Sequence, residues 1–323
     1  MNSRQKKKHA LFNKFSENLK HIIEVTQLQD IIPPFEKSDL YICPLSMKCY
    51  DREGLKNIYL DHLTLEHSPP ESLKGSIVAL TAKDHNSKDG HSQDISLQRY
   101  INNREFNRGI ATIVTRGKVN DSISMQLSFK KQDPMQVTFR TKTFHFGAQK
   151  FVDLLKNQTK FNVSFKLPNI KNVDISFLKI AYLKAFETFG YILLFNKGGF
   201  NPHYKRVREL ILNKNTNDHP EIIWFENDYD DEFLGVNIVT SPVAMRCILV
   251  IFDLKTENAT HRFGVFLPAI DDYGFKGIEN ISKLKRNKTK FNFEMDLVSD
   301  SLDITKYDHS FYLWRYWQKR FPV

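Results

Sequence analysis

Residues 174–196 form the longest apolar helical stretch in the sequence, and they limit the folds that the chain can adopt. Apolar side chains occur almost all round this predicted helix instead of along one stripe. A helix without a polar face must be covered on every side, so we expect it to lie at the centre of a core. Asp174 is a suitable N-cap residue and is the predicted start of the helix.

The sequence around this helix predicts a mixture of helices and antiparallel strands. Apolar residues recur at helical spacing over residues 10–30 and again over 203–212. Alternating or short apolar runs predict strands at 110–114, 122–129, 136–139, 222–225, 247–252 and 263–267. We therefore predict an α+β fold in which an antiparallel sheet accompanies a central buried helix.

The composition favours a soluble protein with an affinity for polyanions. No apolar run approaches the roughly 18 residues that a membrane helix needs, so we expect no membrane association. Three cysteines are too few for a disulfide scaffold, and the basic start of the chain does not resemble a signal peptide, which favours the cytoplasm. The 47 Lys and Arg exceed the 37 Asp and Glu, and the net charge of +10 favours nucleic acid as a partner. Solubility alone is the alternative explanation of the charge.

Residue types that carry chemistry are concentrated between Leu63 and His91. A predicted strand ends in Glu66-His67 and is followed by the pair Pro69-Pro70. A second short strand then leads to Asn86, which would open a helix. Two strands, a proline-stiffened loop and a helix predict a ββα unit of about thirty residues.

This segment resembles the HNH endonucleases, also called ββα-metal or His-metal finger nucleases. The resemblance covers about residues 41–100 of the sequence. It rests on positions that arrive in order: Glu66-His67, Pro70, Ser72-Leu73, Gly75, Leu80-Thr81, Asn86 and Gly90. The resemblance implies an N-terminal HNH module that hydrolyses DNA phosphodiester bonds with a divalent metal. It also implies a role in restriction or phage defence.

The resemblance assigns roles that suit this chemistry. His67 would be the general base, since an imidazole with a pKa of about 6.5 can take a proton from water at neutral pH. Glu66 and Asn86 would bind Mg²⁺ or Mn²⁺, because these cations prefer oxygen ligands. His91 would be a further residue of the catalytic site, as a secondary ligand or a phosphate contact. The lysines of the segment are predicted to contact the nucleic-acid backbone: Lys74, Lys83 and Lys88.

The segment departs from the family where most members bind a structural zinc. Four cysteines are common at these positions, and this sequence has Cys43, Ser46, Ala82 and His85. A tetrahedral zinc site needs four donors, so we expect no structural zinc. Packing within a larger protein would replace it. Lys74 also stands where the family usually has the first of two glycines.

We predict three parts along the chain. Residues 1–35 form a helical segment, residues 36–105 the HNH module, and residues 106–323 an α+β domain that positions nucleic acid or a partner. DNA is the expected substrate; RNA, a partner subunit and a second copy of the chain remain open. The alternative function is that of a catalytically inactive protein that binds nucleic acid or a partner through a relic HNH fold.

Overall fold

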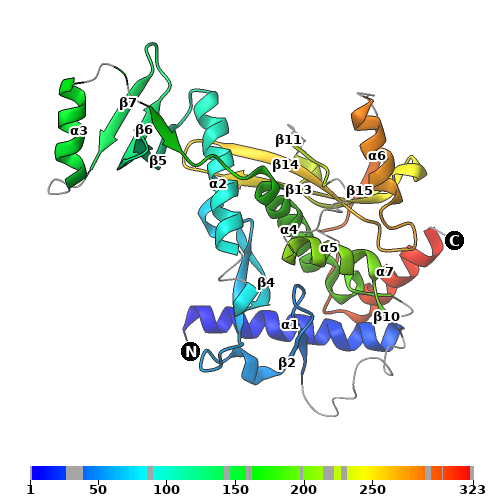
Figure 1. The fold of residues 1–323 in the computed structure, drawn as a ribbon. Helices are drawn as coiled ribbons and strands as arrows, with labels where there is room; N and C mark the ends of the chain where they lie inside the picture. Colours follow the sequence, from blue (N-terminus) through cyan, green and yellow to red (C-terminus); the bar gives the residue numbers. More distant parts are fainter. Residues whose placement is uncertain are drawn as a thin grey trace. The chain divides into compact units, whose positions relative to one another are not determined.

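The computed structural model describes residues 2–26, 39–85, 90–141, 146–157, 160, 162–196, 199–213, 222–226, 231–287, 292–299 and 301–320. It has the predicted α+β fold, with helices and antiparallel sheets (Figure 1). The chain divides into two compact units. The larger unit comprises Met1–Gln93, Asp174–Lys255 and Thr260–Val323, and the smaller unit comprises Asp94–Val173 with Thr256–Ala259.

These boundaries differ from the expected division into residues 1–35, 36–105 and 106–323. The first 93 residues share one unit with the late strands of the chain, and the smaller unit is formed mainly by residues 94–173. The reason is that the N-terminal segments pack against α4 (Ile170–Phe189), which lies far from them in the sequence. Phe15 stacks on Phe186 with ring centroids 4.6 Å apart, and Ser68 Oγ donates to the carbonyl of Ile180. Composition shifts along the chain do not reveal such non-local packing.

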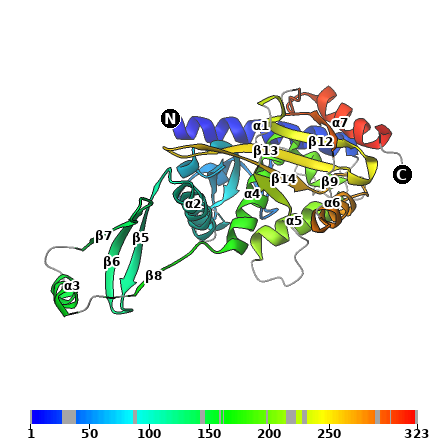
Figure 2. The ribbon, with the colours of Figure 1, turned by 90° about the horizontal axis from the view of Figure 1, so that it is seen from above.

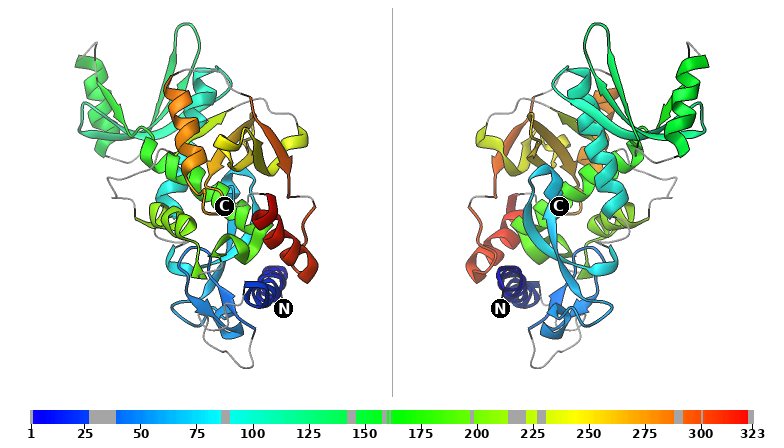
Figure 3. Two further views of the ribbon diagram at one scale, coloured as in Figure 1. Left: turned by 90° about the vertical axis from the view of Figure 1, so that its right-hand side faces the viewer. Right: turned by 90° about the vertical axis from the view of Figure 1, so that its left-hand side faces the viewer.

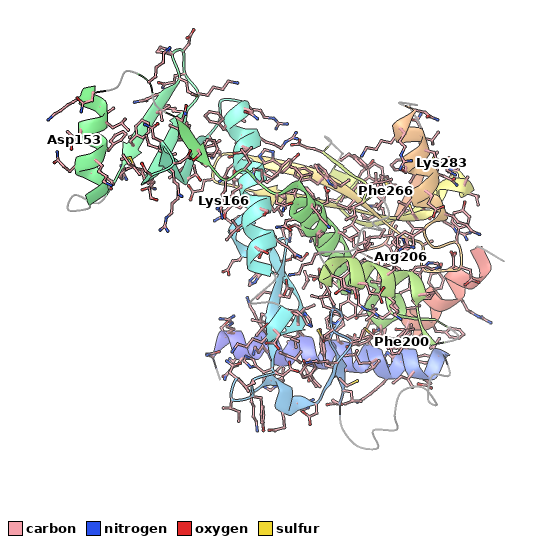
Figure 4. The ribbon with its side chains drawn as sticks, in the orientation of Figure 1. Asp153, Lys166, Phe200, Arg206, Phe266 and Lys283 are labelled. Atoms are coloured by element: carbon pink, nitrogen blue, oxygen red, sulfur yellow. The ribbon has the colours of Figure 1, made fainter. Side chains whose placement is uncertain are left out.

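The larger unit is built around a five-stranded antiparallel sheet in the order β11-β14-β13-β12-β15. Its strands are β11 (Trp224–Glu226), β12 (Gly235–Ser241), β13 (Cys247–Lys255), β14 (Thr260–Leu267) and β15 (Glu294–Leu297). Its other elements are α1 (Ser3–Thr26), β1 (Tyr41–Ile42), β2 (Cys49–Tyr50), β3 (Leu63–Ser68), β4 (Ser76–Ala82), β9 (Phe195–Asn196), β10 (Gly199–Phe200), α5 (Pro202–Leu212), α6 (Lys276–Arg286) and α7 (Tyr307–Arg320). Figure 4 labels four residues of this unit, Phe200 on β10, Arg206 on α5, Phe266 on β14 and Lys283 on α6.

Helices cover both faces of the five-stranded sheet. On one face, Ile278 and Ile281 of α6 pack against a cluster that includes Leu249 and Ile251 of β13. On the other face, the ring of Phe177 in α4 lies 4.5 Å from Trp224 and 4.7 Å from Phe263, measured between ring centroids. The prediction of a helix buried at the centre of the core is confirmed.

The start of that helix differs from the prediction. α4 begins at Ile170, and Asn169 Oδ1 accepts a hydrogen bond from the backbone N–H of Asn172 at 3.3 Å. Asp174 lies inside the helix and accepts a hydrogen bond from Trp224 Nε1 at 2.7 Å. Its carboxylate therefore ties α4 to β11 and does not cap the helix.

The two ends of the larger unit lie side by side. Asn18 of α1 donates from Nδ2 to the carbonyl of Ile304 at 3.0 Å and lies 3.3 Å from Ser310 Oγ of α7. His21 and Tyr307 also meet edge to face, with ring centroids 5.7 Å apart. Figure 3 shows α1 beside α7.

The smaller unit is a four-stranded antiparallel sheet with one covering helix. Its strand order is β7-β6-β5-β8, formed by β5 (Thr112–Val119), β6 (Ile123–Lys130), β7 (Gln136–Arg140) and β8 (Val163–Phe165). Figure 2 shows α3 (Phe146–Asn157) beside the strands of this sheet. Phe151 and Leu154 of α3 pack in one core cluster with Met125 and Leu127. Most of α2 (Gly90–Asn107) also belongs to this unit.

The helices that the structure describes include none that is long and apolar enough to cross a lipid bilayer.

Candidate functional site

Glu66 lies in a buried polar cluster between β3, β4 and α4. The residue is 4% exposed. Its Oε1 lies 2.7 Å from the ammonium Nζ of Lys179 in α4, and its Oε2 accepts a hydrogen bond from Thr81 Oγ1 of β4 at 2.8 Å. Lys179 is also almost completely buried, at 7% exposure. Both carboxylate oxygens of Glu66 are therefore occupied by side chains of the protein.

This arrangement does not fit Mg²⁺ or Mn²⁺ at Glu66. A divalent cation on the carboxylate would lie beside a buried ammonium group and would be repelled by it. The described residues contain no group of three or more His, Cys, Asp and Glu side chains that could hold a metal ion. The sequence did not indicate Lys179, because it lies 113 positions after Glu66 within an apolar helix.

His67 lies beside an irregularity in the hairpin of β3 and β4. The register shifts between Glu66, which pairs with Ala79, and His67, which pairs with Ile77. Glu66 and Ser68 both bond to α4, since Ser68 Oγ donates to the carbonyl of Ile180 at 3.1 Å. Side chains alternate along a strand, so His67 lies on the side of β3 away from α4. The structure thus does not bring Glu66 and His67 onto one side of the strand.

The structure describes only some of the other residues that were predicted to form the nuclease site. Asn86 and Lys88 lie outside the described residues, and the side chain of His91, in the first turn of α2, lies outside them too. Lys74 and Lys83 are exposed. Two strands and a helix do follow one another as β3, β4 and α2, but the residues that would join the helix to the site are among those not described.

Hydrogen bonds join three of the four positions that correspond to zinc ligands in the HNH family: Cys43, Ser46 and Ala82. The buried Sγ of Cys43 accepts hydrogen bonds from the backbone N–H of Ser46 at 3.5 Å and of Ala82 at 3.4 Å. The buried hydroxyl of Tyr182 also donates to the carbonyl of Pro44. The turn after Cys43 and the end of β4 are therefore joined by protein contacts.

A second candidate site is the outer face of the sheet in the smaller unit. Side chains that point away from α3 on β5, β6 and β7 form what we call the basic sheet face: Thr112, Val114, Arg116, Lys118, Ser124, Gln126, Ser128, Lys130, Gln136, Thr138 and Arg140. All are exposed except the half-buried Ser128. The face carries four positive charges and no carboxylate.

The strand register aligns these side chains in rows. Arg116 pairs with Gln126, which in turn pairs with Arg140, so one row across three strands reads Arg, Gln, Arg. In the next row on one side Lys118 pairs with Ser124. On the other side Val114 pairs with Ser128, and Thr112 pairs with Lys130 in the row beyond it. Cations and neutral hydrogen-bonding groups alternate over the surface.

A groove of about 870 Å³ lies where the basic sheet face meets α2. Its basic lining residues are Arg99, Arg116, Arg140 and Lys166, and the described residues that line it include no Asp or Glu. In the described part of the chain none of these four side chains forms an ion pair. Figure 4 labels Lys166 in this unit and Asp153 on α3, which covers the opposite face of the sheet.

The smaller unit also holds most of the excess charge of the protein. Its residues include 14 Lys and Arg but six Asp and Glu, which gives +8 of the chain's net +10. The alternation of residues predicts strands here, but it does not give the register that brings these charges onto one face. The signal was available, since basic and small polar residues occupy every second position from Thr112 to Lys118 apart from Val114.

Comparison with known proteins leaves the family of the chain open. A scan against models of protein families, a search of curated proteins and a search of solved structures each found no match to this chain.

Proposed function

We propose that this protein binds DNA through the sugar-phosphate backbone, with the basic sheet face as the contact surface. The observation that carries the proposal is a set of cations on the basic sheet face and along the adjoining groove that form no ion pair with any described residue. The described residues of this face and of the groove lining include no Asp or Glu. Exposed like charges in one area repel one another, and a polyanion turns this repulsion into attraction.

The geometry of the face suits a backbone better than a base. Neighbouring strands lie about 4.8 Å apart, so the Cα atoms of Arg116 and Arg140, two strands apart, are about 10 Å from each other. Duplex DNA presents one charge per roughly 1.7 Å of its axis, so a face of this width meets several phosphates. Arginine can bond two phosphate oxygens at once, and Ser, Thr and Gln side chains supply neutral hydrogen bonds.

Sequence preference should be weak. Phe129 and Phe139 belong to the core under α3 and are not on the basic sheet face. Phe165 packs against the same core and also lines the adjoining groove, where it is an aromatic side chain within reach of a ligand. Stacking of bases on aromatic rings is the usual means by which a sheet binds single-stranded nucleic acid. We therefore expect backbone binding that depends steeply on salt.

Fluorescence anisotropy with labelled duplex DNA at several salt concentrations tests this proposal. Each lost phosphate contact should reduce the slope of log K against log salt by about 0.9, so the double variant Arg116→Gln/Arg140→Gln should lose roughly 2 from the slope. The matched control is Lys150→Gln/Lys156→Gln, which removes two exposed charges of α3 from the same unit.

Equal slopes for the two double variants would contradict the proposal, because net charge alone would then explain binding. A labelled RNA of equal length forms the second arm. If RNA binds more tightly than DNA, RNA and not DNA is the partner.

The second candidate function is cleavage of nucleic acid with His67 as general base. The observation that favours it is the position of His67 beside the irregular pair of β3 and β4, half buried and without a hydrogen bond or ion pair to any described residue. A histidine side chain is a common general base in hydrolysis. The phage-defence role and the ligand role of Asn86 implied by the HNH resemblance depend on this candidate, whereas Glu66 does not fit as a metal ligand here.

Plasmid nicking with Mg²⁺ or Mn²⁺ by the wild type and by His67→Ala tests the second candidate. Loss of cutting in the variant supports it. Equal cutting by both proteins would exclude His67, and no cutting by the wild type would leave binding as the function. If binding and cleavage both occur, we expect them in the cytoplasm, where the free thiols of Cys43, Cys49 and Cys247 stay reduced.

A further inference from the structure

A separate pocket of about 580 Å³ lies in the larger unit at the start of α1. The turn Arg52–Leu55 and the segment from Asn57 to Thr64 form its other walls. Six basic residues line it, Arg4, Lys8, His9, Arg52, Lys56 and His62, and the described residues of its lining include no Asp or Glu. We call it the α1 pocket.

Lys8 is the buried cation of the α1 pocket. It is 5% exposed, and its Nζ donates to the carbonyl of Leu63 at 2.6 Å and to Asn57 Oδ1 at 2.9 Å. Both acceptors are neutral, and an ammonium group has three donors. Burial, together with the nearby charge of Arg4, lowers the pKa of Lys8. A buried charge without a counter-ion is costly, and a bound anion would remove that cost.

Two further basic residues of the pocket already have partners. Arg52 pairs with Asp39 at 2.5 Å and Lys56 with Glu53 at 2.6 Å. His62, 5% exposed, bonds through Nδ1 to the carbonyl of Tyr59 at 2.6 Å. That contact places a proton on Nδ1, so Nε2 remains for a ligand.

The start of α1 adds a positive potential that the sequence does not neutralise. The first turn holds no acidic residue, although carboxylates stabilise that end of a helix. Asn2 caps the helix, with Oδ1 accepting from the backbone N–H of Gln5 at 2.9 Å. The side chains of Arg4 and His9 extend the positive charge along the pocket wall.

We propose that the α1 pocket binds the phosphate of a nucleotide, either a free nucleoside phosphate or the phosphorylated end of a nucleic-acid strand. The cation set binds phosphate oxygens, and Leu55 and Ile58 give the pocket an apolar wall for the nucleoside. The volume lies within the range of about 300–1,000 Å³ that small-molecule sites occupy. The inference is independent of the basic sheet face, because it uses residues of the larger unit alone.

Isothermal titration calorimetry with inorganic phosphate, AMP, ATP and a short 5′-phosphorylated oligonucleotide tests the proposal. The oligonucleotide is titrated into Arg116→Gln/Arg140→Gln, which weakens binding to the basic sheet face, and a 5′-hydroxyl strand of the same sequence measures the binding that remains there. We expect AMP or ATP to bind more tightly than inorganic phosphate. Arg4→Gln/His9→Gln should weaken that binding at least about tenfold.

The matched control is Lys6→Gln/Lys7→Gln, which removes two exposed charges from the same helix outside the pocket. It should leave affinity within about twofold of the wild type. Both nucleotide and 5′-phosphorylated strand binding, or either alone, supports the proposal and identifies the source of the phosphate. Equal loss in the two double variants, equal affinity for 5′-phosphorylated and 5′-hydroxyl strands with no nucleotide binding, or no binding of any probe overturns it.

Discussion

Lys74 is a residue whose backbone conformation does not suit its side chain. Its φ angle of 61° lies in the left-handed region, where a Cβ atom costs about 1–2 kcal/mol. The next residue, Gly75, has no room for a side chain, since a Cβ would lie 1.6 Å from the carbonyl oxygen of Pro69. The backbone of this loop therefore favours glycine at both positions, and the sequence has glycine only at the second.

Replacement of Lys74 by glycine should stabilise the protein. Lys74→Gly relieves the left-handed strain but adds freedom to the unfolded chain, so we expect the free energy of unfolding to rise by about 0.5–1 kcal/mol. Urea unfolding measures the change. Lys74→Ala is the control, because alanine retains the Cβ and should give no such gain. A gain of equal size in both variants would mean that the lysine charge, and not the backbone, is the cause.

The contact between Glu66 and Lys179 predicts unequal effects of single and double substitutions. Lys179→Met leaves the carboxylate buried without its counter-charge and should lower the free energy of unfolding by about 3–5 kcal/mol. Glu66→Gln/Lys179→Met removes both charges and should cost less. Chemical denaturation of the three proteins gives the comparison. If the double variant is the less stable one, the pair contributes through packing and not through charge.

At the scale of elements, Asp61 connects β2 to the segment that leads into β3. Its carboxylate lies 2.6 Å from Lys48 Nζ and accepts a hydrogen bond from the Tyr50 hydroxyl at 2.8 Å. The hydrogen bond from Lys48 is the largest cause of the lowered pKa of Asp61. A carboxyl whose pKa falls on folding stabilises the fold above its unfolded pKa of about 3.9 and loses this contribution as the pH falls through the folded value.

Asp61→Asn should therefore destabilise the protein in a pH-dependent way. Near pH 7 we expect a loss of about 0.5 kcal/mol, because the carboxyl is partly exposed and water screens the pair. Near about pH 2 the variant and the wild type should be equally stable. Urea titrations at both pH values test this. The control is Glu71→Gln, at an exposed carboxylate without an ion pair in the described chain, and a loss there of the same size would contradict the argument.

The alternation of residues in β5, β6 and β7 explains how one sheet can form a core on one face and a binding surface on the other. Odd-numbered residues such as Met125 and Leu127 fill the core under α3, and even-numbered ones such as Arg116 and Gln126 face outward. A shift by one residue would exchange the two faces. Binding and stability of the smaller unit should thus be separable by substitution.

At the scale of the whole molecule, the two units have separate cores. Leu127 belongs to the core of the smaller unit and Leu249 to the core between α6 and the five-stranded sheet. Differential scanning calorimetry should show two transitions. Leu127→Ala and Leu249→Ala should each lower a different one, by about 8 °C or more. A single transition that both variants lower equally would mean that the units unfold together.

Local patterns were sufficient to predict much of the fold. The apolar residues of α4 and the period-two alternation of β5 to β7 are properties of neighbouring residues, and they predicted a buried helix and antiparallel strands. The ends of helices and strands were harder to predict from the sequence. Asp174 has the chemistry of an N-cap, but the indole of Trp224, fifty positions later, takes its carboxylate.

The geometry of the candidate sites was even less predictable from local sequence than the ends of the helices. From the sequence it is clear which side chains carry charge, that positive charges are in excess, and that Glu66 and His67 are neighbours in a predicted strand. The pairing of Lys179 with Glu66, the shared row of Arg116 and Arg140, and the place of Lys8 in a pocket whose described lining has no carboxylate all come from the fold. They do so because the effect of a charge depends on the groups around it in space, and those groups come from segments far apart in the sequence.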